Sequence, residues 1–125
     1  MANPKDMNEL LCMDPMKLIA WCHDKYNDPL PTPGTSAEFK EYSYLLSDLA
    51  NQYAFISSCH AAATVMVRVA KRKKEPAEII DAMLSRRDVL DTYVGILKMK
   101  YEAFSRMITV QKQAADEMRM LGEIT

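Results

Sequence analysis

The stretch after Pro76 limits the possible shape of this chain more than any other feature. It contains no further proline, and it repeats an apolar pattern over six heptads. One apolar position of the seven-residue repeat holds Met83, Leu90, Leu97, Phe104, Gln111 and Met118. The other apolar position holds Ile80, Arg87, Val94, Tyr101, Ile108 and Ala115. The pattern predicts a long helix over residues 76–121. The SRRD segment at 85–88 could act as a cap that divides it into a short and a long helix, so both alternatives stay open.

A second long helix is predicted over residues 36–74. Thr35 with Glu38, or Ser36 itself, can cap its start, and Pro76 ends it because a proline ring cannot follow a continuing α-turn. A helix of about 38 residues spans roughly 57 Å, which exceeds the width of a compact domain of this size. We therefore expect an elongated helical hairpin. Its apolar stripes exceed what one partner helix can cover, which indicates packing against a third helix or against other subunits, and we expect a homo-oligomer.

The N-terminal part, residues 1–27, is predicted to form short helices. Asp6 and Glu9 have the spacing of a capping box, and Asp14-Pro15 can start a second helix with Asp as its cap. A proline-rich loop at 28–36 then separates this element from the long helices.

Composition agrees with a single all-α domain. The chain has 125 residues, 49% of them hydrophobic, and only three glycines, and it shows no sustained apolar and polar alternation. Its wholly apolar runs are short, so no membrane span is expected. Three cysteines without framework spacing fit a reducing compartment, and we expect a cytoplasmic protein, in the host cytoplasm if a phage encodes it.

No residue pattern indicates catalysis, a metal site or a cofactor. Both histidines directly follow a cysteine, as Cys22-His23 and Cys59-His60, and neighbouring residues on a helix do not share a face. A metal tetrad would require both pairs to meet, and buried thiols are the commoner outcome. Phosphate-loop, dinucleotide and hydrolase motifs are also absent from the sequence. We therefore expect a protein that is not an enzyme.

The positive charge is concentrated in one part of a chain whose net charge is −1. Residues 67–112 hold eleven basic and six acidic side chains, whereas acidic residues predominate on both sides of this range. The candidate nucleic-acid-binding residues are Arg68, Lys71, Arg72, Lys73, Lys74, Arg86 and Arg87. A local field can act despite a neutral total.

Two interpretations of this basic run stay open. Cations at a helix C-terminus interact favourably with the helix dipole and bind free carbonyls, so the run is in one interpretation a solvated helix end. Four consecutive cations repel one another, however, and a phosphate backbone relieves that repulsion. In a ring of hairpins, one such weak patch would be repeated many times, and avidity would make binding strong.

The last helix is predicted to contribute a seam that packs in the core or against other subunits. Its residues are Leu90, Val94, Leu97, Tyr101, Phe104 and Ile108.

Residues 88–121 resemble the end of the UvsY-type recombination mediators of tailed phages. The matching features are Asp88-Val89-Leu90, Tyr93 with Gly95-Ile96-Leu97, the small-residue and basic pattern after Phe104, and Met118-Arg119. The order of a long helix, a basic stretch and a turn before them is also similar.

The resemblance implies an oligomeric, non-enzymatic protein that binds single-stranded DNA. Such a protein helps a recombinase displace single-strand binding protein, so both are implied as partners. The family's DNA-contacting segment falls by position on Arg68, Lys71 and Arg72. A small helical adaptor or inhibitor in phage–host interaction, which binds a protein without nucleic acid, is the alternative hypothesis.

Overall fold

The computed structural model describes residues 6–30 and 39–124, and it confirms the all-α prediction. Helix α1 spans Met7–Cys12, α2 spans Pro15–Tyr26, α3 spans Phe39–Arg72 and α4 spans Ala77–Ile124. The described ranges contain no strand. Thr35, Ser36 and Glu38, the residues expected to cap the first long helix, lie outside them.

Both short helices begin at the predicted aspartates. The Asp6 carboxylate accepts a hydrogen bond from the Glu9 backbone N–H at 2.8 Å, and Asp14 accepts one from the Met16 N–H at 3.2 Å. Pro15 occupies the first turn of α2, where its missing N–H costs nothing. Each cap satisfies a donor that the first helical turn leaves free.

A tight turn at residues 73–76 joins α3 to α4. The Lys74 N–H donates to Lys71 O at 3.2 Å, and the Glu75 N–H donates to Ala70 O at 3.1 Å. These are the two hydrogen bonds of a Schellman motif, and Lys74 occupies its left-handed position with φ 56°. The helix thus ends two residues before the predicted Lys74. Pro76 then accepts the first backbone hydrogen bonds of α4, from Ile79 and Ile80.

Helix α4 is continuous through residues 85–88, which settles the question that the SRRD segment raised. The segment is helical throughout, and Arg86 and Arg87 are partly buried within it. Because Leu90 follows in the buried seam, a break here would cost packing as well as backbone hydrogen bonds.

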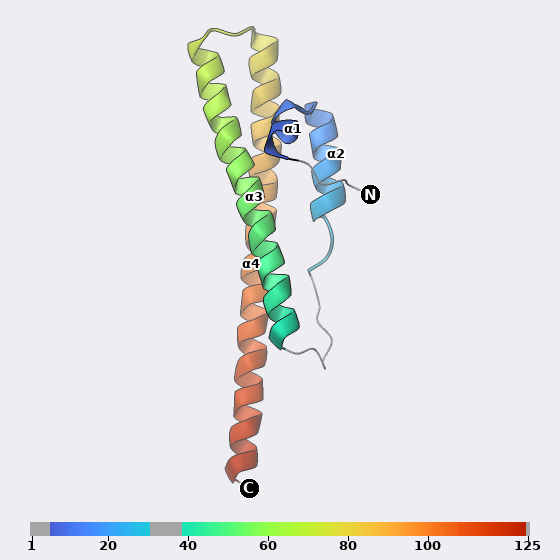
Figure 1. The fold of residues 1–125 in the computed structure, drawn as a ribbon, viewed down its shortest axis with the longest axis vertical. Helices are drawn as coiled ribbons and strands as arrows, with labels where there is room; N and C mark the ends of the chain where they lie inside the picture. Colours follow the sequence, from blue (N-terminus) through green and yellow to red (C-terminus); the bar gives the residue numbers. More distant parts are fainter. Residues whose placement is uncertain (1–5, 31–38, 125) are drawn as a thin grey trace.

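Helices α3 and α4 lie side by side in opposite directions, and α2 packs along α4 while α1 contacts α3 (Figure 1). The main core therefore lies where the two short helices meet the two long ones. It contains Leu10, Leu11, Leu18, Trp21, Cys22, Tyr26, Ile56, Cys59, Ala63, Leu90, Tyr93 and Leu97. The rings of Trp21 and Tyr26 pack edge to face, with their centroids 5.7 Å apart. This contact stabilises the core in addition to the area that both aromatics bury.

A smaller cluster holds the lower part of the two long helices together. Tyr42 and Leu49 of α3 enclose the fully buried Phe104 of α4, and Tyr101 and Ile108 pack against them. Beyond Ile108, α4 continues without another described helix beside it (Figure 1). Every residue of α4 from 109 to 122 is exposed.

By length and composition, α3 could also span a membrane over Lys40–Arg72. Core helices of soluble proteins meet the same criterion, and α3 supplies five of its residues, Tyr42, Leu49, Ile56, Cys59 and Ala63, to the two core clusters.

Candidate nucleic-acid interface

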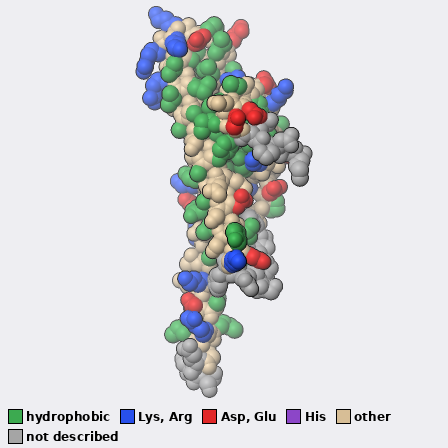
Figure 2. Space-filling model, viewed as in Figure 1, with side chains coloured by type: hydrophobic (Ala, Val, Ile, Leu, Met, Phe, Trp, Pro, Cys, Tyr) green, Lys and Arg blue, Asp and Glu red, His purple; other side chains and the backbone are tan. Residues whose placement is uncertain are grey.

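Five exposed cations cluster at the end of the molecule where α3 turns into α4. Arg68, Lys71 and Arg72 lie in the last turns of α3, and Lys73 and Lys74 form the turn itself. We call these five residues the basic tip. Figure 2 shows Lys and Arg side chains gathered at this end.

The basic tip is not used to cap α3. Backbone N–H groups bind three of the last four carbonyls of the helix: Lys73 donates to Val69 O at 2.9 Å, and the two Schellman bonds bind the carbonyls of Ala70 and Lys71. Within the part of the chain that the structure describes, none of the five side chains forms an ion pair or a hydrogen bond. Their donors are therefore available to an external anion.

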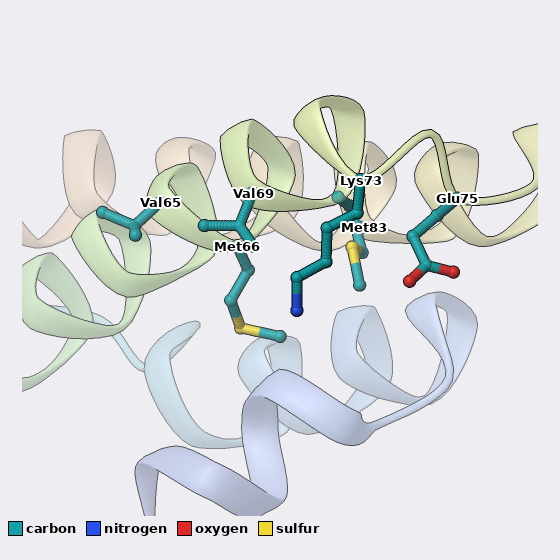
Figure 3. A pocket seen from close by; sticks show the side chains of 7 residues that line it. Val65, Met66, Val69, Lys73, Glu75 and Met83 are labelled. Atoms are coloured by element: carbon teal, nitrogen blue, oxygen red, sulfur yellow. The ribbon is translucent and has the colours of Figure 1, made fainter.

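The cations are divided between two faces. Residues 68, 71 and 72 share one face of α3 by their spacing of three and four. Lys73 lies on another face, where it borders an apolar hollow of about 270 Å³ (Figure 3). The hollow is lined by Val65, Met66, Val69, Ala70, Lys73, Glu75 and Met83. The first face is thus the one suited to a chain of phosphates.

Acidic residues lie in the turn and in the first turns of α4. Glu75, Glu78 and Asp81 are exposed, and they lower the positive potential on the α4 side of the tip. The field is therefore strongest over α3, on the face of Arg68 and Arg72.

The tip offers charge without a stacking surface. No aromatic residue occurs between Phe55 and Tyr93 in the sequence. Base stacking on aromatic rings, which contributes about 1–3 kcal/mol per base in single-strand-binding proteins, is therefore absent from this end. The arrangement suits contact with phosphates and no readout of base sequence.

Arg86 does not belong to the basic tip. It lies nine residues into α4, about 14 Å along the helix, and its Nε donates to Met13 O at 2.6 Å. Met13 is the C-cap of α1, so Arg86 connects the N-terminal helices to α4. The structure therefore gives this predicted phosphate-binding residue a structural contact. Arg87 is partly exposed, and it pairs loosely with Asp88 at 3.5 Å.

Lys100 makes an equivalent contact two heptads further along α4. Its Nζ donates to Tyr26 O, and to Asp28 O at 2.6 Å, at the C-terminal end of α2. Burial lowers the pKa of Lys100, and the nearby Asp28 carboxylate partly opposes this effect. Sequence reasoning missed this role, because the acceptors lie more than 70 residues away and no local pattern marks them.

The two cysteine–histidine pairs do not converge on a metal site. Cys22 and Cys59 are both in the main core, where burial raises their pKa values to about 12 and about 11. His23 points elsewhere and contacts the Asn27 side chain at 3.2 Å, while His60 lies 3.6 Å from Asp91. No group of three or more potential metal ligands occurs among the described residues.

The predicted seam lies inside the molecule. Leu90, Leu97 and Phe104 are fully buried, and Val94, Tyr101 and Ile108 are partly buried against the two clusters. Within the described residues, this seam is used for packing of the chain on itself.

In a comparison with protein families, with curated proteins and with solved structures, no family model, no curated protein and no solved structure matches this chain.

Proposed function

We propose that this protein is a homo-oligomeric, non-enzymatic mediator of the phage recombination type, which binds single-stranded DNA through its basic tip and assists recombinase loading. The elongated helical hairpin would be the repeating unit. The resemblance of residues 88–121 to recombination mediators supports the choice of single strands, recombinase and single-strand binding protein as partners.

One observation carries the DNA-binding part of the proposal. Backbone N–H groups bind the carbonyls of Val69, Ala70 and Lys71 near the end of α3, so capping of these carbonyls does not account for the cations beside them. Arg68, Lys71 and Arg72 remain exposed on one face with no partner among the described residues. Phosphates of a nucleic-acid backbone are ligands that reward several such cations together.

Binding of this kind follows counterion release. Each phosphate neutralised on a single strand contributes about 0.7 to the slope of log K against log salt. The three cations on one face of a single tip therefore bind weakly near physiological salt. Several tips on one oligomer would bind one strand much more strongly, because each further contact is intramolecular.

The test removes the three cations of one face. The variant Arg68→Ala, Lys71→Ala, Arg72→Ala should weaken binding to an oligo-dT strand about tenfold or more at 50 mM salt and reduce the salt slope by about 2. Fluorescence anisotropy at several salt concentrations measures both quantities. An unchanged binding curve would reject the site.

A control with the same loss of charge uses exposed lysines away from the tip. Lys17→Ala, Lys40→Ala, Lys98→Ala removes three cations from α2, α3 and α4. This control should retain most of the affinity. An equal loss in both variants would show that net charge, and not the basic tip, determines binding.

A second candidate function is favoured by the exposed apolar residues of α4. Val110, Met118 and Leu121 are 62%, 73% and 63% exposed on the last part of α4, where every residue from 109 to 122 is exposed. An adaptor or inhibitor that binds another protein would use such a surface. Recovery of one stoichiometric protein partner after nuclease treatment, lost in Val110→Asp and Met118→Asp variants, would favour this function over the first.

A further inference from the structure

The last part of α4, residues 109–124, extends beyond the end of α3 as a single helix. We call it the α4 tail. At 1.5 Å per residue it is about 24 Å long. Isolated helices of this length are marginal in water, and most helical stability in proteins comes from packing of an apolar face. The α4 tail therefore requires a surface that its own chain does not provide within the described residues.

Most apolar side chains of the tail lie beside the seam that faces α3, not on it. The seam positions after Ile108 are Gln111, Ala115 and Met118, which are all exposed. A neighbouring stripe shares Met118 with the seam, and it has Met107 partly buried at its start and the rest exposed. Its members are Met107, Val110, Ala114, Met118 and Leu121.

The spacing of residues in this stripe is the same from either end. The spacings between its residues are three, four, four and three, so all of them lie on one helical face, and the pattern is symmetric about Ala114. When the tail is placed against an antiparallel copy of itself, Met107 faces Leu121, Val110 faces Met118, and Ala114 faces Ala114. Large residues then meet large residues at the ends, and the small residue allows close approach at the centre.

Charge selects the antiparallel direction over the parallel one. On one edge of the stripe, Arg106 lies beside the first half and Glu117 beside the second half, and both are exposed. Lys112, Asp116 and Arg119 lie on the opposite face of the helix, where Arg119 pairs with Asp116 at 3.5 Å. An antiparallel pair places the basic half of each tail against the acidic half of the other, whereas a parallel pair places like charges together.

The symmetric stripe begins where α3 stops covering α4. Met107, its first residue, is partly buried against the cluster of Tyr42, Leu49 and Phe104, whereas Val110 and the later members are exposed.

From these observations, we infer that the α4 tail is a self-association surface, on which two copies of this chain pair in antiparallel fashion about Ala114. This inference deepens the proposed homo-oligomer and is independent of DNA binding. It places the two basic tips at opposite ends of the pair, about 110 Å apart, from the length of α4 between residue 77 and the centre. Such a pair is suited to connect two segments of nucleic acid, or two positions on one strand.

Cysteine cross-linking tests both the pairing and its direction. The exposed Cys12 is first changed to Ser, which leaves the buried Cys22 and Cys59 unreactive. Val110→Cys and Met118→Cys are then made in two forms of different mass, alone and mixed, and oxidised. Both positions are exposed, so circular dichroism should show unchanged helix content.

An antiparallel pair predicts a disulfide only in the mixture, between Cys at 110 of one copy and Cys at 118 of the other. Self-linked products from each variant alone would demonstrate a parallel pair and overturn the inference. An Ala114→Cys variant should cross-link with itself, and its failure to do so would also overturn it.

Light scattering supplies an independent readout. The wild-type mass should decrease toward that of the monomer on dilution, and Val110→Glu, Met118→Glu should remain monomeric at all concentrations. A monomeric wild-type protein, or a variant of unchanged mass, would refute the pairing. Strand binding by a single basic tip would survive this failure, which separates the inference from the proposed function.

Discussion

The cations in the middle of α4 and those of the basic tip are chemically alike but differ in what they contact. Arg86 and Lys100 donate to backbone carbonyls at the ends of α1 and α2, and both are partly buried. The five cations of the tip are exposed, and backbone N–H groups bind the carbonyls of Val69, Ala70 and Lys71 beside them. A cation is thus structural where a third helix ends beside it and available where only two helices meet.

Apolar residues show the same division along the molecule. Leu97 is fully buried where α2, α3 and α4 meet, whereas Leu121 is 63% exposed on the α4 tail. The number of helices that surround a residue, at its position along α4, therefore determines whether it is buried and stabilises the fold or is exposed to solvent.

The largest expected effect compares the same substitution in both regions. Leu97→Ala should lower the free energy of unfolding by about 2–5 kcal/mol, because it removes buried surface and leaves a cavity. Leu121→Ala should change it by less than about 0.5 kcal/mol in dilute solution. Urea unfolding followed by circular dichroism measures both. Equal losses would show that the tail is packed like the core.

High pH should destabilise the middle of the molecule through its buried thiols. Burial raises the pKa of Cys59 from 9.0 to about 11, so the native state favours the neutral thiol more than the unfolded chain does. This contribution is complete below pH 9 and is lost as the pH rises toward 11, with a total on the order of 2 kcal/mol. Unfolding curves of wild type and Cys59→Ala between pH 8 and 11 test it. The free energy of unfolding of the variant should decrease less steeply with rising pH than that of the wild type. An identical decrease would exclude Cys59 as the cause.

The hydrogen bond of Arg86 should contribute more to the free energy of unfolding than the ion pair of Arg87. Arg86→Ala leaves Met13 O without its donor and should cost about 1–3 kcal/mol, with faster hydrogen exchange in α1. Arg87→Ala removes only a loose surface pair and should cost less than about 1 kcal/mol. If the two variants unfold alike, the structural role of Arg86 is wrong. Neither variant should reduce strand binding as much as the triple variant of the tip.

The smallest expected effect is a gain in stability at the tip. Lys74 has a φ of 56°, a conformation that glycine adopts without steric cost. Lys74→Gly should therefore raise the free energy of unfolding by about 0.5–1 kcal/mol and also relieve repulsion within the basic run. Lys73→Gly is the matched control, since Lys73 does not have a positive φ and gains nothing. A loss of stability in Lys74→Gly would contradict this reading of the turn.

Much of the fold could be predicted from local chemistry. The caps at Asp6 and Asp14, the end of α3 before Pro76 and the buried seam at Leu90, Leu97 and Phe104 all depend on residues close in sequence or on one helical period. The exposed position of the basic tip could be predicted for the same reason. Continuity of α4 through residues 85–88 could not, because SRRD is compatible with a cap and with an interior helix, and packing decides between them.

The helices, the turn at Pro76 and the concentration of cations beside it can be predicted without a structure. They follow from hydrophobic periodicity, from proline geometry and from local charge, respectively. The tertiary structure alone decided which cations are available. Arg86 and Lys100 became structural because the ends of two short helices, some 73 and 74 residues away, dock beside them. It also decided that α4 extends past α3, because only the relative positions of the two helices show which residues of a long apolar pattern remain uncovered.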